Sequence, residues 1–296
     1  MQDFDYVAAR RIDEVVSLLN SDGDQVRILS GGTDLLVQLR EGRRKARLVV
    51  DVKGVPELNE LKFDPTMGLR LGAAVTCLRF CGDEQIAAAY PGLVDAVSLI
   101  GGTQIQGRAT VGGNLCNASP AADTIPALIV HGAVCEIAGP AGRRELPVRD
   151  FCTAPGRNAL QPGEFLVALR VPPPPEGFGA RYLRFIPRNE MDIAVVGAGA
   201  AVKLSPDGSV IEWARVALGA VAPTPLAVDA AGEFLAGKAV SLENLRQASF
   251  IARDAARPIT DMRGTVEQRR HLSAVLSRRA LEGAVERARQ TLQVPA

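Results

Sequence analysis

Four consecutive prolines, Pro172 to Pro175, constrain the fold of this 296-residue chain more than any other feature. Proline has a fixed φ and no backbone N–H, so such a run can continue neither a helix nor the interior of a sheet. We therefore expect an extended linker here. A chain of this length also exceeds the usual size of one hydrophobic core. With a second break at Gly54-Val55-Pro56, the sequence predicts three parts: residues 1–56, 57–175 and 176–296.

The first two parts are predicted to contain short strands and short helices in alternation. Leucine-rich and β-branched runs bounded by turn residues indicate the strands, and apolar residues at helical spacing indicate the helices. The expected strands are Val26–Leu29, Leu48–Val52, Leu69–Val75, Ala133–Ala138 and Glu164–Val171, and the expected helices are Ile12–Asn20, Leu35–Arg40, Pro91–Leu99 and about Ala121 to Val130.

The third part is predicted to contain three strands followed by helices. The strands are expected at Tyr182–Phe185, Ile193–Lys203 and Ile211–Leu218. Ser205-Pro206-Asp207-Gly208 has the composition of a hairpin turn between the last two. The C-terminal helix is indicated by apolar residues at helical spacing, namely Leu272, Val275, Leu276, Leu281 and Val285. The predicted fold class is α+β.

The charge and hydropathy of the chain argue against several classes of partner. A net charge of +1 provides no electrostatic reason to expect nucleic acid or a membrane surface. No apolar run approaches the length of a transmembrane helix. We expect a cytoplasmic protein with no membrane span.

The cysteines and histidines predict neither a disulfide framework nor a metal site. The chain has five cysteines, an odd number, and two histidines, His131 and His271. Cys77 and Cys81 are separated by three residues, but no second pair with metal-ligand spacing accompanies them. Neither histidine lies in a motif for nucleophilic catalysis, and both are expected to be structural. We expect no metal and no catalytic residue on this chain.

Two glycine-rich segments have the sequence pattern of anion-binding turns. The first glycine loop, Ser30-Gly31-Gly32-Thr33-Asp34, follows an expected strand and precedes a helix at Leu35. The second glycine loop, Thr110-Val111-Gly112-Gly113-Asn114, also follows a short extended segment. Glycines permit close backbone approach, and the N–H groups at a helix start can face an anion. One Gly-Gly after a strand is usually only a turn, but two such loops could bind both phosphates of a dinucleotide.

Two further segments allow more than one interpretation. Ala118-Ser119-Pro120-Ala121-Ala122-Asp123 has small residues that leave room for a ligand. Asp123 could accept hydrogen bonds from ligand hydroxyls or could simply cap a helix, and the sequence alone favours neither role. Val196-Gly197-Ala198-Gly199-Ala200-Ala201-Val202 begins like a dinucleotide fingerprint, but it lacks the third glycine and leads into a hairpin turn instead of a helix. We interpret it as a buried strand.

Taken together, these motifs resemble the FAD-binding medium subunit of molybdenum hydroxylases. The segments that carry the resemblance span nearly the whole chain: Ser30 to Leu36, Arg108 to Leu115, Ala118 to Asp123, Asp192 to Val196, Asp261 to Thr265, and Arg269 to Leu272. The resemblance implies a two-part PCMH-type FAD-binding domain, followed by a C-terminal α+β domain with a three-stranded antiparallel sheet and helices. The chain departs from the family pattern at Gln106-Gly107, where the family often has Arg-Asn.

The resemblance also implies which residues contact the FAD. The two glycine loops would bind the diphosphate and the adjoining ribityl chain, Asp123 would bond the ribityl hydroxyls, Ile100 and Leu166 would lie beside the rings, and Arg184 would place a cation near the flavin's pyrimidine edge. The implied cofactor-binding residues are Ser30, Gly31, Gly32, Thr33, Asp34, Leu35, Ile100, Thr110, Val111, Gly112, Gly113, Asn114, Ser119, Asp123, Leu166 and Arg184.

The implied function is electron transfer within a larger enzyme. A large subunit would carry the molybdenum cofactor and a small subunit the [2Fe-2S] clusters, in a dimer of heterotrimers. Electrons would pass from the clusters through FAD to an external acceptor. Two alternatives remain: a self-contained FAD oxidase or reductase of the same flavin-domain superfamily, and a scaffold subunit that has lost FAD. The sequence identifies neither the organic substrate nor the terminal acceptor.

Overall fold

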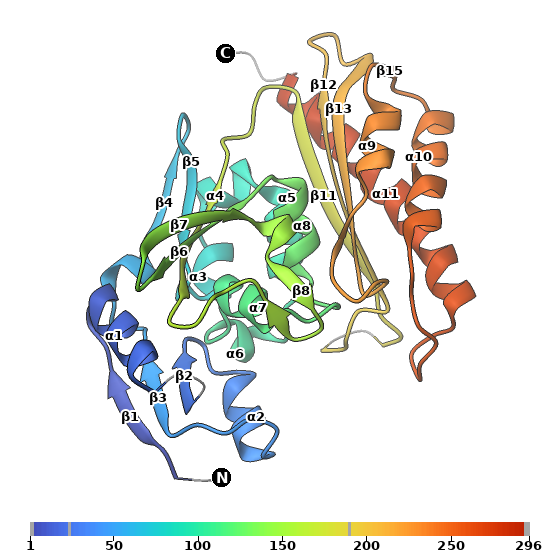
Figure 1. Ribbon diagram of the computed structural model, residues 1–296. Helices are drawn as coiled ribbons and strands as arrows, with labels where there is room; N and C mark the ends of the chain where they lie inside the picture. Colours follow the sequence, from blue (N-terminus) through green and yellow to red (C-terminus); the bar gives the residue numbers. More distant parts are fainter. Residues whose placement is uncertain (1–2, 23–24, 189–190, 293–296) are drawn as a thin grey trace.

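The computed structural model describes residues 3–22, 25–188 and 191–292. Its three larger sheets follow one another along the chain, and each is built from a separate stretch of sequence (Figure 1). The prolines at 172–175 lie between the second and third sheets, outside any helix or strand. The three sheets fall within the three predicted parts, although the boundaries at 56 and 175 themselves stay a prediction.

The first sheet is parallel and has three strands in the order β1-β3-β2. Its middle strand is buried along its whole length, which is why its sequence is a continuous apolar run ending in Asp51. The elements of this part are β1 (Asp5–Ala8), α1 (Ile12–Asp22), β2 (Val26–Leu29), α2 (Leu35–Arg40) and β3 (Leu48–Asp51).

The second sheet is antiparallel, has five strands in the order β4-β5-β10-β6-β7, and packs against short helices. Its strands are β4 (Leu61–Asp64), β5 (Gly68–Gly72), β6 (Val134–Gly139), β7 (Gly142–Pro147) and β10 (Phe165–Val171), with a small hairpin of β8 (Cys152–Ala154) and β9 (Arg157–Asn158). The helices are α3 (Cys77–Cys81), α4 (Glu84–Ala89), α5 (Pro91–Val97), α6 (Thr103–Gln106), α7 (Val111–Asn117) and α8 (Thr124–Val130), with single helical turns at Pro56–Asn59 and Val148–Asp150.

The third sheet is also antiparallel, with the order β11-β12-β13-β14 and β15 pairing with β13. Its strands are β11 (Phe178–Phe185), β12 (Val196–Leu204), β13 (Val210–Gly219), β14 (Leu226–Ala227) and β15 (Lys238–Ala239). Its helices are α9 (Asp229–Leu235), α10 (Leu242–Ala255) and α11 (Val266–Leu292). The three expected strands are the long ones, and the two-residue β14 and β15 were not predicted.

The glycine- and alanine-rich segment at 196–202 is a buried strand, as predicted. Both of its faces are covered, because α8 contacts one side of the sheet and α11 the other (Figure 1). A Cβ on Gly199 would lie 3.0 Å from the Pro126 carbonyl oxygen, so larger residues would push α8 away. The expected hairpin turn is present after this strand, with the Gly208 N–H donating to the Ser205 carbonyl at 2.8 Å.

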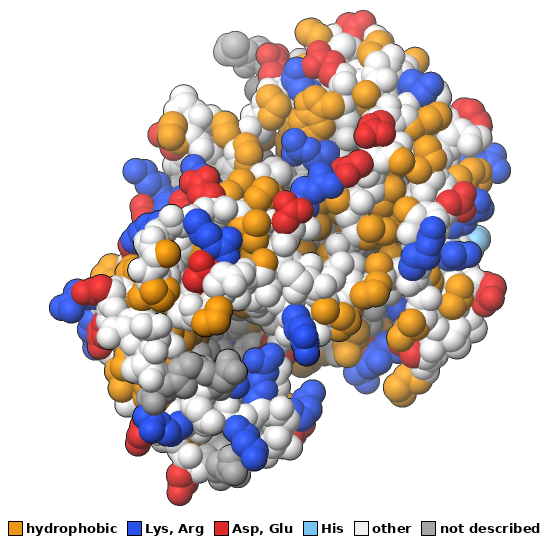
Figure 2. All heavy atoms as spheres, in the orientation of Figure 1, with side chains coloured by type: hydrophobic (Ala, Val, Ile, Leu, Met, Phe, Trp, Pro, Cys, Tyr) orange, Lys and Arg blue, Asp and Glu red, His pale blue; other side chains and the backbone are white. Residues whose placement is uncertain are grey.

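The fold class is α+β, as predicted, and the parts share buried surfaces. Residues of the first sheet and of α1 pack with Ala138, Phe165 and Val167 of the second sheet. Helices α5 and α8 lie between the second and third sheets. None of the described helices combines the length and apolar character needed to cross a bilayer. On the face in view in Figure 2, acidic and basic side chains are interspersed.

Candidate functional site

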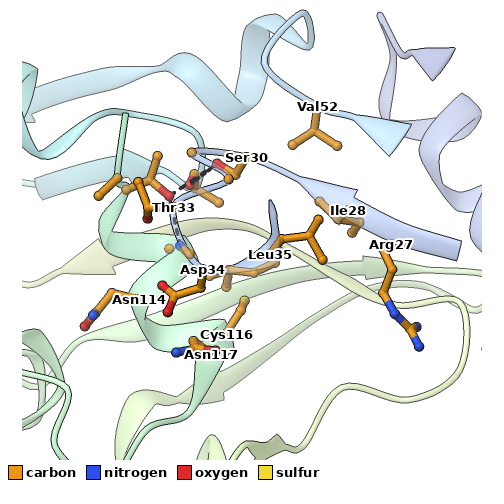
Figure 3. A pocket seen from close by; sticks show the side chains of 18 of the residues that line it. Arg27, Ile28, Ser30, Thr33, Asp34, Leu35, Val52, Asn114, Cys116 and Asn117 are labelled. Atoms are coloured by element: carbon orange, nitrogen blue, oxygen red, sulfur yellow. Dashed lines mark hydrogen bonds between the residues drawn. The ribbon is translucent and has the colours of Figure 1, made fainter. Parts of the chain in front are cut away.

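The two glycine loops lie against each other, although they are about 80 residues apart in sequence. The first loop connects β2 to α2, and the second forms the start of α7. The Ser30 Oγ and Thr110 Oγ1 atoms are 3.2 Å apart (Figure 3). Both loops line one pocket between the first sheet and the second.

Glycine is required where the loops approach the neighbouring backbone. A Cβ on Gly31 would lie 2.2 Å from the Arg108 carbonyl oxygen, in the segment that leads into the second loop. A Cβ on Gly112 would lie 2.7 Å from the Ala73 Cα atom. Both distances are far below van der Waals contact, so these glycines permit the close approach of the two loops.

A chain of hydrogen bonds connects the loops and has a fixed direction. The Gly113 N–H donates to Thr110 Oγ1 at 2.9 Å, and Ser30 Oγ donates to the Ala73 carbonyl at 3.4 Å. Each hydroxyl has a single proton, so the Thr110 hydroxyl donates to Ser30 Oγ. The Gly113 N–H and the Thr110 hydroxyl, which the sequence suggested as ligand donors, are therefore used within the protein. The Asn114 side chain is also engaged, because its Oδ1 accepts from the Thr124 hydroxyl at 2.6 Å.

Other backbone donors of the loops have no partner. Within the described part of the chain, the structure records no acceptor for the N–H groups of Gly31, Gly32, Thr33, Asp34, Leu35 and Gly112. All of these residues line the pocket. Unpaired backbone N–H groups in a partly enclosed site are costly unless water or a ligand accepts from them. Their concentration at two loop–helix junctions favours an anion.

Apolar side chains line the rest of the pocket. Among the predicted residues, Ile100 and Leu166 are part of this lining. The lining also contains residues that were not predicted from the sequence, among them Arg27, Ile28, Gln38, Arg44, Val52, Leu58, Cys116, Asn117, Leu160 and Phe165. For some of them a signal existed: Asn117 lies three residues after Asn114 in α7, and Gln38 of α2 lies four residues after Asp34, so both follow a predicted residue by about one helical turn. The Gln38 amide donates to Asn117 Oδ1 at 3.4 Å.

Four predicted residues do not line the pocket: Val111, Ser119, Asp123 and Arg184. Val111 is buried in α7. Asp123 makes no side-chain cap to α8; instead its carboxylate accepts from the Tyr182 hydroxyl and from Arg184 Nη1, both at 2.8 Å. Both donors belong to β11, so the cluster joins the second part of the chain to the third. Whether these four residues contact a cofactor stays a prediction.

The Asp123 cluster is strongly desolvated. Burial raises the pKa of Asp123, against the opposing effects of Arg184 and of the Tyr182 hydroxyl. Burial also raises the pKa of Tyr182 well above its ordinary value. Among the described residues, the Arg184 Nε–H has no hydrogen-bond partner. This buried donor is available to a ligand group at the junction of the two parts.

The cysteines and His131 have structural surroundings, whereas His271 is exposed on α11. All five cysteines are free thiols, and burial raises the pKa of Cys116, beside the pocket, to about 12. His131 is buried, with Nδ1 2.7 Å from the Ala127 carbonyl oxygen. The described residues contain no cluster of His, Cys, Asp or Glu side chains that could hold a metal ion.

Comparisons with known proteins match nearly the whole chain. The family model "FAD binding domain in molybdopterin dehydrogenase" matches residues 2–174, and "CO dehydrogenase flavoprotein C-terminal domain" matches residues 181–284. The xanthine dehydrogenase FAD-binding subunit of Escherichia coli O157:H7 is 32% identical over 98% of this chain and 100% of that protein. The carbon monoxide dehydrogenase medium chain of Afipia carboxidovorans is 34% identical over 97% of this chain and 98% of its own length.

A solved structure has the same fold over nearly the whole chain. Reconstituted CO dehydrogenase from Oligotropha carboxidovorans contains a chain that superposes with a TM-score of 0.92 at 32% identity, covering 97% of this chain and 99% of that one. The predicted resemblance is confirmed. The chain belongs to the FAD-binding medium subunits of the xanthine dehydrogenase and carbon monoxide dehydrogenase family, and is an FAD-binding, electron-transferring oxidoreductase subunit.

Proposed function

We propose that this chain binds one FAD across the two glycine loops and carries electrons from [2Fe-2S] clusters on a small partner subunit to an external acceptor. A large subunit with the molybdenum cofactor would oxidise the organic substrate. We further propose a dimer of heterotrimers in the cytoplasm. When bound, FAD supplies the ability to accept electrons singly and release them as a pair.

The unpaired N–H groups of the loops are the observation that carries this proposal. They belong to Gly31 through Leu35 and to Gly112, which all line one pocket, and such a set suits an acceptor with many oxygens, such as a diphosphate. The Asp34 side chain also lines the pocket, and its negative charge excludes the carboxylate, unlike the backbone N–H of the same residue, as a phosphate ligand. Its carboxylate suits the hydroxyls of a ribose or ribityl chain. Ile100 and Leu166 would flank a flat ring.

Asp123 and Arg184, which do not line the pocket, belong to a buried cluster with Tyr182 that could contact the flavin ring. We propose that the orphaned Arg184 Nε–H faces the flavin's pyrimidine edge and that Asp123 holds the guanidinium in place. A fixed cation at this edge favours negative charge on the ring. Ser119, at the turn before α8, would contact the ribityl chain.

Both alternatives have less support. A self-contained oxidase would require its own substrate site, whereas relatives named as subunits or chains of larger enzymes align with this chain over nearly their full length. A scaffold without FAD would have no reason to retain unpaired amides in a lined pocket. The relatives have different named substrates, among them carbon monoxide and caffeine, so the substrate would be selected by the partner chain.

FAD binding by a matched pair of glycine variants tests the proposal. Gly31→Ala forces the loops apart, because its Cβ would overlap the Arg108 carbonyl. Gly107→Ala is the control, since its Cβ would meet nothing closer than 3.6 Å. Apo-protein is titrated with FAD by flavin fluorescence. We expect the first variant to bind FAD at least tenfold more weakly, roughly a loss of 1.4 kcal/mol, and the control to bind normally. Normal binding by both would refute the site.

A second experiment separates the subunit from a self-contained enzyme. Native protein purified through a tag is expected to bring a large and a small partner, with molybdenum and iron measurable in the complex. Protein that purifies alone and oxidises a substrate without partners would support the self-contained alternative instead.

A further inference from the structure

Lys53 lies beside the first glycine loop because of the sheet topology. Strands β2 and β3 are parallel neighbours, with Leu29 paired to Asp51 (Figure 1). Their carboxyl ends therefore lie at the same edge of the sheet. Ser30 follows β2 at this edge, and Lys53 follows β3 by two residues. The Val52 N–H, which donates to the Leu29 carbonyl at 3.1 Å, extends the pairing as far as the loop.

A buried carboxylate fixes the Lys53 side chain. The Lys53 ammonium lies 2.7 Å from Asp51 Oδ2, and the Lys53 N–H donates to Asp51 Oδ1 at 2.9 Å. The Tyr6 hydroxyl donates to Asp51 Oδ2 at 2.6 Å. Asp51 is only 8% exposed. Burial raises its pKa, but the hydrogen bonds from Lys53 and Tyr6 outweigh that effect and the pKa lies below its ordinary value. The ammonium therefore has one well-defined position.

From this position Lys53 donates to the carbonyl of Ser30 at 3.3 Å. The Ser30 C=O and the Gly31 N–H belong to the same planar trans peptide and point in opposite directions. Fixing the carbonyl toward Lys53 therefore directs the Gly31 N–H away from it. Gly31 is one of the pocket-lining residues whose N–H has no recorded acceptor within the described chain. A peptide next to glycine rotates easily. The hydrogen bond from Lys53 to the Ser30 carbonyl therefore restricts the direction of the Gly31 N–H.

The Ser30 side chain is held independently. Its hydroxyl donates to the Ala73 carbonyl and accepts from Thr110, while its carbonyl accepts from Lys53. The side chain of Ser30 is thus tied to the second part of the chain, and its carbonyl is tied to Lys53 of the first part. A cationic donor on the carbonyl also polarises the peptide, which makes the Gly31 N–H a stronger donor.

We propose that Lys53 is a positioning residue for the cofactor diphosphate: by binding the Ser30 carbonyl, it holds the Gly31 N–H toward the pocket. The inference rests on the proposed placement of FAD across the glycine loops. Because Asp51 neutralises its charge, Lys53 acts mainly through orientation and only weakly through long-range attraction of the phosphates.

The test measures the dissociation constant of FAD from apo-protein variants. Lys53→Met removes the donor, whereas Lys53→Arg retains a cationic donor and should restore binding. Lys45→Met is a charge-matched control, since Lys45 is an exposed cation in the same part of the chain. Loss of a bond from a charged donor is worth about tenfold in affinity. We expect about tenfold weaker FAD binding for Lys53→Met and near-normal binding for the other two.

Two further measurements keep the result interpretable. In Lys53→Met the buried Asp51 carboxylate loses its ion-pair partner, which could itself disturb the fold. The double variant Asp51→Asn with Lys53→Met removes that unpaired charge, and we expect the same loss of FAD affinity from it. The loss should also persist at about 0.5 M salt, where attraction between exposed charges is largely screened. Normal FAD binding by Lys53→Met or by the double variant, weak binding by Lys53→Arg, or recovery of binding at high salt would overturn the proposal. If Gly31→Ala also binds FAD normally, the proposal that FAD binds across the glycine loops is wrong. If Gly31→Ala is impaired and Lys53→Met is not, only the proposed role of Lys53 is refuted.

Discussion

Acid should destabilise this protein through His131, a buried imidazole between the second and third sheets. Burial, helped by Arg215 and Arg287, lowers its pKa to about 4 against the opposing effects of the Ala127 carbonyl and Asp95. Because the folded pKa is depressed, the unfolded chain binds a proton below about pH 6.5 and the folded chain does not. Stability from the neutral ring is therefore complete above pH 6.5 and is lost as the pH falls toward 4.

The magnitude follows from the two pKa values. For an unfolded value of 6.5 and a folded value of about 4, the linkage relation gives a loss of about 2 kcal/mol between pH 7.5 and pH 5. The structural reason is that the ring packs between Tyr90 and Phe178, with no hydrogen-bond partner for Nε2 among the described residues. An added proton there would have no acceptor.

Urea unfolding of the apo-protein from pH 5 to 8 measures this effect. The variant His131→Asn keeps a donor for the Ala127 carbonyl but does not titrate, and the difference between the two proteins cancels the contribution of every other group, including Asp123. We expect the wild type to lose about 2 kcal/mol more than the variant on going to pH 5. Equal pH dependence in the two proteins, or a ring whose NMR titration in the folded protein is centred near pH 6.5, would refute the reasoning.

Two other predictions concern the Asp123 cluster and Cys116. Asp123→Asn leaves the buried Arg184 without its counter-ion, and urea unfolding should show a loss of about 3 kcal/mol. The control is Asp229→Asn, which breaks the exposed ion pair with Arg149 and should change stability by less than about 1 kcal/mol. Equal losses of unfolding free energy in the two variants would contradict the claim that burial determines the size of the loss. Cys116 should resist a thiol reagent at pH 8 until the protein unfolds, because its pKa of about 12 keeps the thiol neutral. Modification is mapped by mass spectrometry, and rapid modification of Cys116 in the native protein would show the prediction to be wrong.

Local signals explain why both glycine loops were predictable. The first loop lies between a β-branched strand and a helix at the predicted residues, and both elements are present as expected. The strand at 196–202 was distinguished from a nucleotide fingerprint by the hairpin turn after it. In these cases the signal lies within a few neighbouring residues.

Other features depend on contacts that a local pattern does not contain. Helix α7 begins with Val111-Gly112-Gly113, which has poor intrinsic helix propensity, yet it forms because Thr110 caps it and Ala73 packs against Gly112. The outer strand β7 contains Arg143, Arg144 and Glu145, so it lacks the apolar run of a buried strand. The Asp123–Arg184 ion pair joins residues 61 positions apart in different parts of the chain. Sequence alone does not place such a pair.

Hydrogen exchange of the backbone amides tests the central claim most directly. In the proposed complex, the FAD diphosphate accepts hydrogen bonds from N–H groups that are unpaired in the protein alone, from Gly31 to Leu35 and at Gly112. On adding FAD to apo-protein, peptides covering residues 30–36 and 110–115 should both become protected, while a peptide from exposed parts of α10 should not change. Protection confined to one loop, or to neither while FAD is bound, would contradict a diphosphate held between them.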